Sequence, residues 1–302
     1  MKLLTSYGGT MLRPTASRIP RQEIINTLNG QPQRVFRRSD LEKILKGNRK
    51  TWRLSADTTA HSFIQYLLKN SPLREAKFKF PSRTEVRYAW GDAPSLEVVQ
   101  SLRPNSYFTH YTALYLHNLT EQIPKTVFLN TEQPAKRTTP AILEQAAIDR
   151  AFSNAVRQSR TCANLSDQRV CLLNGKFTDQ LGVIDFTDPQ GEKIRVTNVE
   201  RSLIDIVVRP VYSGGVYQVL DAYRAAAKAV SINKLAAYLQ KLEYVYPYHQ
   251  AIGFYLERAG NYSQTAIDLM RKFEIKYDFY LTYQIQDKDY SPAWHLFFPK
   301  GL

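Results

Sequence analysis

The sequence has little cysteine and no long hydrophobic run. Its 302 residues include 2 cysteines, Cys162 and Cys171, which are too few for a disulfide framework or for a zinc site made of cysteines alone. We expect both to be free, buried thiols, because disulfides are rare in a reducing cytoplasm. No segment approaches the roughly 18 consecutive apolar residues of a membrane-spanning helix, and residues 1–12 lack the apolar core of a signal peptide. The sequence therefore predicts a cytoplasmic protein without a membrane partner.

Sequence signatures of catalysis are also missing. There is no phosphate-binding loop and no GxGxxG, GxSxG or HExxH pattern. His110 and His117 are seven residues apart and fall on about the same face of a helix, but no cysteine or carboxylate is placed to complete a metal site. The other histidines are scattered: His61, His249 and His295. The sequence therefore predicts a protein that is not an enzyme and that uses no metal or cofactor.

Basic residues are concentrated in the first third of the chain. The whole chain holds 41 Lys and Arg against 27 Asp and Glu, a formal net charge of +14. Residues 1–92 carry 18 basic and 7 acidic residues, a net charge of +11, whereas residues 93–302 carry 23 and 20, a net charge of +3. A small, strongly basic domain joined to a nearly balanced body is typical of a protein that binds a polyanion. We place the linker at Asp92–Ser95.

Three short helices are predicted in the basic domain. The first covers residues 20–29, where isoleucine and leucine recur on one face. The second begins at Ser39, which stands three residues before Glu42 in the spacing of a capping box. The third runs from about Asp57 to Lys69.

The third predicted helix has two different faces. One face is apolar and should pack inside the domain: Ala60, Phe63, Ile64, Leu67 and Leu68. The opposite face carries hydroxyl, imidazole, amide and ammonium groups: Thr58, His61, Ser62, Gln65 and Lys69. None of these is acidic, and such groups can donate to phosphates and reach base edges in a major groove. The face is predicted to bind DNA; the alternative interpretation is an ordinary solvated face.

A β-hairpin is predicted after the third helix. Residues 74–80 and 83–90 alternate between apolar and polar positions on either side of Pro81-Ser82. We expect one apolar and one largely basic face, with four DNA contacts: Lys77, Lys79, Arg83 and Arg87. Three helices followed by a basic hairpin are typical of a winged helix-turn-helix. The connection before the third helix is unusually long, and it supplies three further predicted phosphate contacts: Arg49, Lys50 and Arg53.

Residues 93–302 mix helices and strands. Helices are predicted at residues 111–119, 140–157, 199–208, 232–242, 248–259 and 264–273, and another after Gly214-Gly215. Strands are predicted at residues 126–130, 170–174, 181–186, 193–196, 278–285 and 293–298. Turn signals separate the second, third and fourth of these strands as in a meander. The order is neither a strict βαβ alternation nor a repeat, so the predicted class is α+β.

Two alternatives remain beside a DNA-binding regulator. The first is a metal-dependent nuclease, or another DNA-processing enzyme, that is targeted by the winged helix. The nuclease needs an acidic residue and a lysine on one strand face. Glu192 and Lys193 are adjacent, so they lie on opposite faces, and Asp185 stands at a strand end next to a turn; we interpret all three as structural. The second alternative is a scaffold whose winged helix binds protein, against which the net charge of the first 92 residues argues.

Two regions resemble the AbiEi-type family of antitoxins and transcriptional regulators. The first is RPNSYF (103–108) leading into TALYLHNLTEQIP (112–124); the second is VERSLID (199–205) followed by RPVYSGG (209–215). Within the second, Arg201 and Asp205 have the i, i+4 spacing of an ion pair, which we interpret as structural together with Glu200. The resemblance covers about residues 100–225 and the winged-helix layout before them.

This resemblance implies an N-terminal winged helix joined to a C-terminal α/β body without enzymatic activity. It implies a repressor that binds operator repeats in double-stranded DNA of its own operon. It also implies an antitoxin that neutralises a nucleotidyltransferase toxin encoded beside it, in an abortive-infection defence against phage. The loops Asn118–Gln122 and Tyr212–Gly215 are our candidates for partner contact, because loops carry function more often than regular elements do. Residues 226–302 lie outside the resemblance.

Overall fold

The computed structural model describes residues 20–135, 143–165, 167–187, 191 and 193–302. The chain divides into two compact units, Met1–Leu102 and Arg103–Leu302, which we call the N-terminal and C-terminal units. The division falls after Leu102 rather than at the predicted linker, because Arg87 in the hairpin donates hydrogen bonds to the carbonyls of Ser101 and Leu102. None of the helices formed by the described residues has the length and apolar content needed to cross a bilayer.

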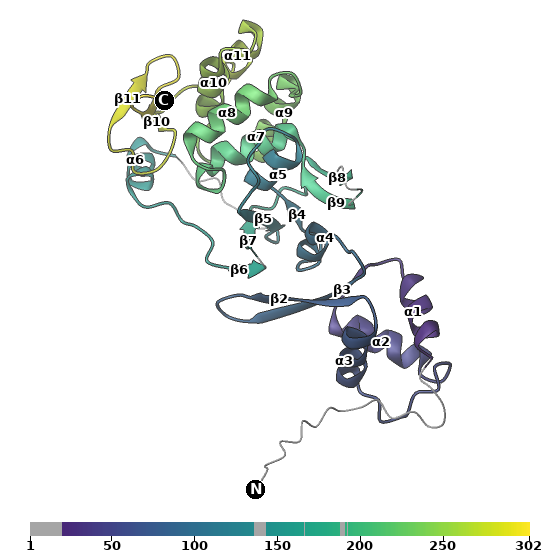
Figure 1. The fold of residues 1–302 in the computed structure, drawn as a ribbon. Coiled ribbons are helices and arrows are strands. Elements are labelled where there is room, and N and C mark those ends of the chain that lie inside the picture. The colour runs from purple at the N-terminus through teal and green to yellow at the C-terminus, as the bar shows by residue number, and fades with distance from the viewer. Residues whose placement is uncertain (1–19, 136–142, 166, 188–190, 192) are drawn as a thin grey trace. The chain divides into compact units, whose positions relative to one another are not determined.

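Helices and a small sheet make up the N-terminal unit (Figure 1). In chain order the elements are α1 (Arg21–Asn29), β1 (Val35–Phe36), α2 (Arg38–Asn48), α3 (Ala60–Asn70), β2 (Leu73–Lys79), β3 (Thr84–Trp90) and α4 (Ser95–Gln100). The sheet has the order β1-β3-β2 and is antiparallel throughout. Its core holds the apolar residues of the helical pattern together with Trp52, which stacks on Phe63 at 5.6 Å between ring centroids.

The helix starts differ from those predicted. Helix α2 begins at Arg38, one residue before Ser39, because the chain is extended up to Arg37 and the Asp40 carboxylate accepts a hydrogen bond from the Arg37 backbone N–H (2.8 Å). The predicted Ser39–Glu42 capping box is therefore wrong. Helix α3 begins at Ala60 rather than near Asp57, capped by the Thr59 hydroxyl.

The hairpin of β2 and β3 has a register that the alternation alone did not predict. Its turn is two residues long, so the backbones of Phe80 and Arg83 are hydrogen-bonded in both directions, at 2.9 and 3.3 Å. The pairs that follow are Lys79 with Thr84, Phe78 with Glu85, and Lys77 with Val86. Directly opposite residues share one face of a sheet. The two lysines therefore share a face with apolar Val86, and the predicted division into one apolar and one basic face is wrong.

The C-terminal unit contains a mixed six-stranded sheet (Figure 1). Its strands are β4 (Tyr107–Phe108), β5 (Thr126–Glu132), β6 (Cys162–Leu165), β7 (Gln168–Gly175), β8 (Val183–Thr187) and β9 (Lys193–Thr197). They are ordered β6-β7-β5-β4-β9-β8, with β5/β7 and β4/β9 parallel. The predicted meander is wrong, because β5 and β4 lie between β7 and β9. The α+β class is as predicted.

The helices of the unit form most of its core. They are α5 (His110–Leu116), α6 (Gln145–Ser153), α7 (Val199–Val208), a 3₁₀ turn (Pro210–Tyr212), α8 (Val216–Ala226), α9 (Ile232–Leu242), α10 (Tyr248–Ala259) and α11 (Gln264–Arg271). Helices α5 and α7 pack against the six-stranded sheet. The bounds of α7, α9 and α10 are those predicted. Ser231 caps α9 by accepting from the Lys234 N–H, and Gly260 ends α10 in the left-handed conformation at φ +76°. Residues 140–142 of the longer predicted helix lie outside the described residues.

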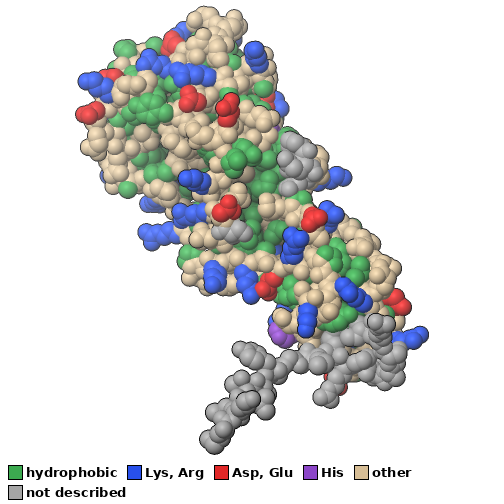
Figure 2. All heavy atoms as spheres, viewed as in Figure 1, with side chains coloured by type: hydrophobic (Ala, Val, Ile, Leu, Met, Phe, Trp, Pro, Cys, Tyr) green, Lys and Arg blue, Asp and Glu red, His purple; other side chains and the backbone are tan. Residues whose placement is uncertain are grey.

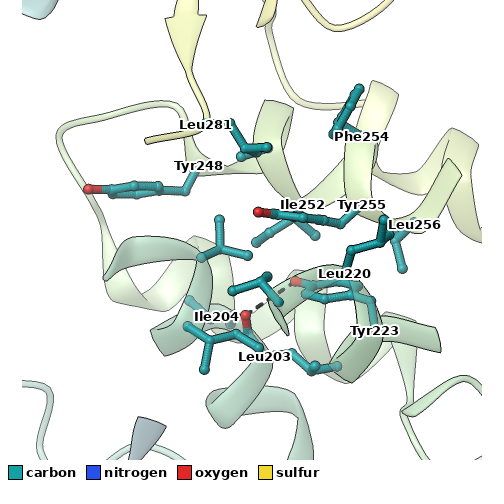
Figure 3. Packing of buried hydrophobic residues seen from close by; sticks show 14 of the residues in the cluster. Leu203, Ile204, Leu220, Tyr223, Tyr248, Ile252, Phe254, Tyr255, Leu256 and Leu281 are labelled. Atoms are coloured by element: carbon teal, nitrogen blue, oxygen red, sulfur yellow. Dashed lines mark hydrogen bonds between the residues drawn. The ribbon is translucent and has the colours of Figure 1, made fainter. Parts of the chain in front are cut away.

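The core between α7, α8 and α10 is rich in tyrosine and aliphatic side chains (Figure 3). The buried Tyr223 donates a hydrogen bond to the Leu203 carbonyl (3.2 Å) and stacks on Tyr255 at 5.3 Å. A Cβ atom at Gly253 would lie 2.2 Å from the Trp294 ring, so glycine allows this buried tryptophan to pack directly on α10. A small sheet completes the chain, in the order β10 (Phe279–Tyr280), β12 (Leu296–Pro299) and β11 (Lys288–Ser291).

Cys162 and Cys171 form a disulfide bond. They stand directly opposite each other on the antiparallel strands β6 and β7, where Cβ atoms come close enough for the two sulfurs to bond. The prediction of two free thiols is therefore wrong. Their nine-residue separation gave no indication of this, because pairing depends on which strands become neighbours.

Candidate nucleic-acid interface

The outer face of α3 presents a stripe of three exposed polar side chains. His61, Gln65 and Lys69 recur every four residues, and no acidic residue lies on the helix. Two other predicted contacts are engaged elsewhere. Thr58 is buried at 6% exposure. The Ser62 hydroxyl donates to the Thr59 carbonyl (3.0 Å) and accepts from the Thr59 N–H (3.1 Å). Thr58 precedes the helix and Ser62 belongs to its capping box with Thr59, so the predicted DNA-binding face is reduced to the stripe.

Arg49 has a structural role instead of the predicted phosphate contact. Its guanidinium donates to the carbonyls of Ser55, Ala56 and Thr58 at 2.6, 2.7 and 2.8 Å. These bonds occupy three of the five guanidinium N–H donors. They also close the long connection between α2 and α3. Lys50 in the same connection is exposed, as is Arg53, which adopts the left-handed conformation at φ +49°.

The hairpin offers exposed cations, but Arg87 is not one of them. Arg87 is buried at 6% exposure, where it holds the carbonyls of Ser101 and Leu102, so its prediction as a DNA contact is wrong. Lys77 forms an ion pair with Glu75 (2.6 Å), and Arg83 one with Glu85 (2.7 Å). Within the described residues no carboxylate lies within ion-pair distance of Lys79. Lys79 can therefore bind an external anion such as a phosphate without first breaking an ion pair.

Exposed basic side chains remain at most of the predicted positions: Lys50, Arg53, Lys69, Lys77, Lys79 and Arg83. Figure 2 shows Lys and Arg side chains at the surface of the N-terminal unit. Three exposed arginines near the start of α2 were missed by the sequence interpretation: Arg34, Arg37 and Arg38. Three arginines within five residues are a basic cluster that the sequence displays directly. They precede the predicted start of the second helix at Ser39 and were not assigned to the DNA-binding surface.

In the C-terminal unit the two predicted partner loops lie next to each other. Tyr111 on α5 hydrogen-bonds the Thr120 hydroxyl (3.2 Å) and the Gln122 side-chain oxygen (3.3 Å). A Cβ atom at Gly214 in the other loop would lie 3.6 Å from the same tyrosine ring. Leu119 is buried in the core. The adjoining exposed apolar side chains are Tyr115, Ile123 and Tyr217, at 38, 71 and 54% exposure.

The charged residues of α7 are buried and form ion pairs. Arg201 and Asp205 make the predicted ion pair at 2.8 Å, with side chains 6% and 8% exposed. Asp205 also accepts from the Thr109 hydroxyl (2.9 Å), and Arg201 donates to the Leu181 carbonyl (2.8 Å). Glu200 accepts from the Ser231 N–H and pairs with Lys234, both at 3.1 Å. The network joins α7 to the strands and to α9.

Of the three residues weighed for a nuclease site, the structure describes Asp185 and Lys193. The Asp185 side chain is 97% exposed and lies 3.8 Å from Arg195, and Glu192 lies outside the described residues. The described part of the chain holds no group of three His, Cys, Asp or Glu side chains arranged to bind a metal. Nothing in this geometry favours the nuclease interpretation.

His110 gives the C-terminal unit a predictable pH dependence. Burial beside Arg201 and Arg209 lowers the pKa of this ring to about 4, whereas an unfolded histidine titrates near pH 6.5. The unfolded state therefore binds the extra proton, so stability is complete above about pH 6.5 and falls as the pH decreases toward 4. The loss is at most about 3 kcal/mol. Burial also lowers the pKa values of His117 and His249, which adds in the same direction.

Urea unfolding at a series of pH values between 7.5 and 4 measures this dependence. A His110→Asn variant should show a shallower decline than the parent chain, since asparagine tolerates the left-handed backbone at this position (φ +54°). His61→Asn, on the exposed face of α3, is the matched control and should keep the parental decline. If His110→Asn lost stability with decreasing pH as steeply as the parent chain, His110 would not be the source of the pH dependence.

Comparison with known proteins adds a likeness of fold. No protein-family model matches the chain, and the search of curated proteins gave no match. The crystal structure of the RV2827C protein from Mycobacterium tuberculosis is similar, with a TM-score of 0.58 and 14% sequence identity over 94% of each chain. The likeness thus extends over both units, and at this identity it concerns the fold alone.

Proposed function

We propose that the protein is a DNA-binding transcriptional repressor and antitoxin that controls its own operon and neutralises a nucleotidyltransferase toxin. The observation that carries the DNA-binding half is the charge asymmetry, a net +11 in residues 1–92 against +3 in residues 93–302, combined with an acid-free exposed stripe on α3. Duplex DNA attracts such a surface through its phosphates. The antitoxin half rests on the family resemblance of residues 100–225.

The element order of the N-terminal unit supports a winged helix-turn-helix. A helix, a short strand, two further helices and an antiparallel hairpin follow one another. In this interpretation α3 enters the major groove, where His61 and Gln65 face base edges and Lys69 contacts a phosphate. The hairpin is the wing, and its lysines hold the phosphate backbone.

Gln65 and Lys79 should affect DNA binding in different ways. Gln65→Ala should relax base preference at one operator position, because an amide pairs bidentately with adenine and the loss of such a pair costs about 1–3 kcal/mol in discrimination. Lys79→Ala should weaken binding to all sequences alike, because a phosphate contact carries no sequence information. Selection of binding sites from a random duplex library, with each variant of the full chain, measures both effects.

The matched control for this experiment is Gln240→Ala, an exposed glutamine near the end of α9 in the C-terminal unit. It should leave both the selected motif and the affinity unchanged. If Gln65→Ala kept the parental motif while Lys79→Ala altered it, the two roles would be reversed and α3 would not be the recognition helix.

In the antitoxin part of the proposal, the surface that binds the toxin lies on the C-terminal unit. The loops Asn118–Gln122 and Tyr212–Gly215 meet at Tyr111, and exposed apolar side chains adjoin them. Such side chains at a loop surface are suited to anchoring a protein partner. The nearly balanced charge of this unit also suits a protein partner better than a polyanion.

Co-expression with the nucleotidyltransferase encoded next to this gene tests the assignment. Residues 103–302 should rescue growth at least partly, whereas residues 1–102 should not. The full chain is the positive control, and an Ile123→Asp, Tyr217→Asp variant of it should lose rescue while keeping DNA binding. Full rescue by residues 1–102 would mean that protection comes from repression alone, and the antitoxin role of the C-terminal unit would then be wrong.

A further inference from the structure

The disulfide lies at the edge of the large sheet, next to the loop that begins with Tyr212. Strand β6 is the outermost strand on its side (Figure 1), and it is four residues long. Cys171 is buried at 5% exposure, while Cys162 is partly exposed. Both cysteines pack with Phe128, Tyr111 and Tyr212 in a small apolar cluster. The bond therefore has one partly exposed cysteine on the β6 side and contacts two tyrosines of the proposed partner surface.

The segment just before β6 connects the disulfide to Tyr212. The Ser159 N–H donates to the Tyr212 hydroxyl (2.7 Å), and the Ser159 hydroxyl donates to the Leu172 carbonyl on β7 (2.7 Å). Thus the short piece of chain that ends in Cys162 also holds the tyrosine. An opening of β6 that extends back to Ser159 would also release Tyr212 from this bond.

The fold of the C-terminal unit does not depend on this bond for its core. Disulfides are needed mainly by small domains that cannot bury enough apolar surface. Here the main core is built from α7 to α11 and the last strands, and neither cysteine belongs to it. The bond instead restrains one short edge strand, whose pairing partner in the sheet is β7.

The surroundings of Cys162 and Cys171 accommodate two reduced thiols as well as the disulfide. The Cys162 sulfur lies 3.7 Å from the Ser159 carbonyl oxygen, so the reduced thiol has a hydrogen-bond acceptor in place. Cys171 lies among apolar side chains, where a neutral thiol is well accommodated. Reduction therefore leaves no buried charge or unpaired donor that would unfold the unit.

We infer that Cys162–Cys171 is a thiol–disulfide exchange site whose reduction releases β6 and the Tyr212–Gly215 loop. A dithiol reductant supplies the two electrons. Its first thiolate attacks the accessible Cys162 sulfur, forming a mixed disulfide and expelling the Cys171 thiolate, which takes up a proton. Its second thiolate then attacks the reductant's own sulfur in the mixed disulfide, so that Cys162 leaves as a thiolate and is protonated. The products are two protein thiols and the cyclic disulfide of the reductant.

Hydrogen exchange of the full-length protein, with and without dithiothreitol, tests the inference without DNA or toxin, so its failure and that of the proposed function are distinguishable. Reduction should speed exchange about tenfold in residues 159–165 and severalfold in residues 210–215, because local opening then needs less free energy. Residues 248–259 of α10 should keep their protection. Thiol labelling under native conditions should rise from none to two groups per chain.

A Cys162→Ser, Cys171→Ser double variant should show fast exchange in residues 159–165 under both conditions, while α10 stays protected. Three results would overturn the inference. Two thiols labelled before any reductant is added would mean that the bond does not form. Unchanged exchange after complete reduction would mean that the bond restrains nothing. Loss of protection in α10 on reduction would mean that the bond supports the whole fold.

Discussion

Asp205→Ala should lower the free energy of unfolding of the C-terminal unit by about 3–5 kcal/mol. The substitution leaves the Arg201 guanidinium buried without its anion, because the two side chains are 6% and 8% exposed and bonded at 2.8 Å. It also removes the acceptor of the Thr109 hydroxyl. A buried charge that loses its partner cannot be rehydrated without disrupting α7, which lies at the centre of the core.

Urea unfolding followed by tryptophan fluorescence measures this effect, since Trp294 is buried in the same unit. Asp221→Ala is the matched control, because Asp221 also pairs with an arginine on its own helix, Arg224 at 3.0 Å, but at 59% exposure. Exposed pairs of this kind contribute about 0–1 kcal/mol. Equal effects of the two substitutions would contradict the role of the network. An Arg201→Met, Asp205→Leu variant should recover part of the loss, because no unpaired charge remains.

The local signals in the sequence predicted the helices of the C-terminal unit well. Helix α9 begins after Ser231 and α10 ends at Gly260, since a hydroxyl cap and a left-handed glycine act within one turn of the chain. The Arg201–Asp205 pair was also predictable, because i and i+4 lie on one helix face whatever the rest of the fold does.

The register of the β2–β3 hairpin could have been predicted from the sequence. Recognition of Pro81-Ser82 as a two-residue turn already fixes Lys79 opposite Thr84, and each further pair follows by counting. Alternation within each strand was correct, but the two alternations were combined in the wrong phase. The mixed faces of the hairpin could therefore have been predicted from the sequence.

Other features depend on contacts that no local pattern reveals. The sequence predicts Arg49 and Arg87 as solvent-exposed cations, yet the guanidinium of each donates hydrogen bonds to backbone carbonyls. The parallel pairing of β5 with β7 and the bond between the cysteines follow from strand order. Strand order and loop closure are set by long-range packing, so the engagement of Arg49 and Arg87, two of the seven DNA contacts predicted in the long connection and the hairpin, could not be judged from residue type alone.

Binding of the full-length protein to duplex DNA should weaken about 10³-fold between roughly 50 and 200 mM salt. Six predicted cations remain exposed: Lys50, Arg53, Lys69, Lys77, Lys79 and Arg83. If each neutralises one phosphate, the slope of log affinity against log salt is about −5, because each contact releases counterions in proportion. Fluorescence anisotropy with a labelled duplex of arbitrary sequence gives this slope, since the phosphate contribution does not depend on base order.

Single substitutions test whether the salt dependence of DNA binding comes from the proposed surface. Lys79→Ala and Lys69→Ala should each reduce the magnitude of the slope by about 0.9. Lys241→Ala, an exposed lysine on α9 of the C-terminal unit, should leave it unchanged. Arg87→Gln should also leave the slope unchanged in any variant that remains folded, because the buried guanidinium faces carbonyls and not solvent. Affinity that changes less than about tenfold over this salt range, or a slope that responds to Lys241 as much as to Lys79, would remove the N-terminal unit as the DNA-binding surface.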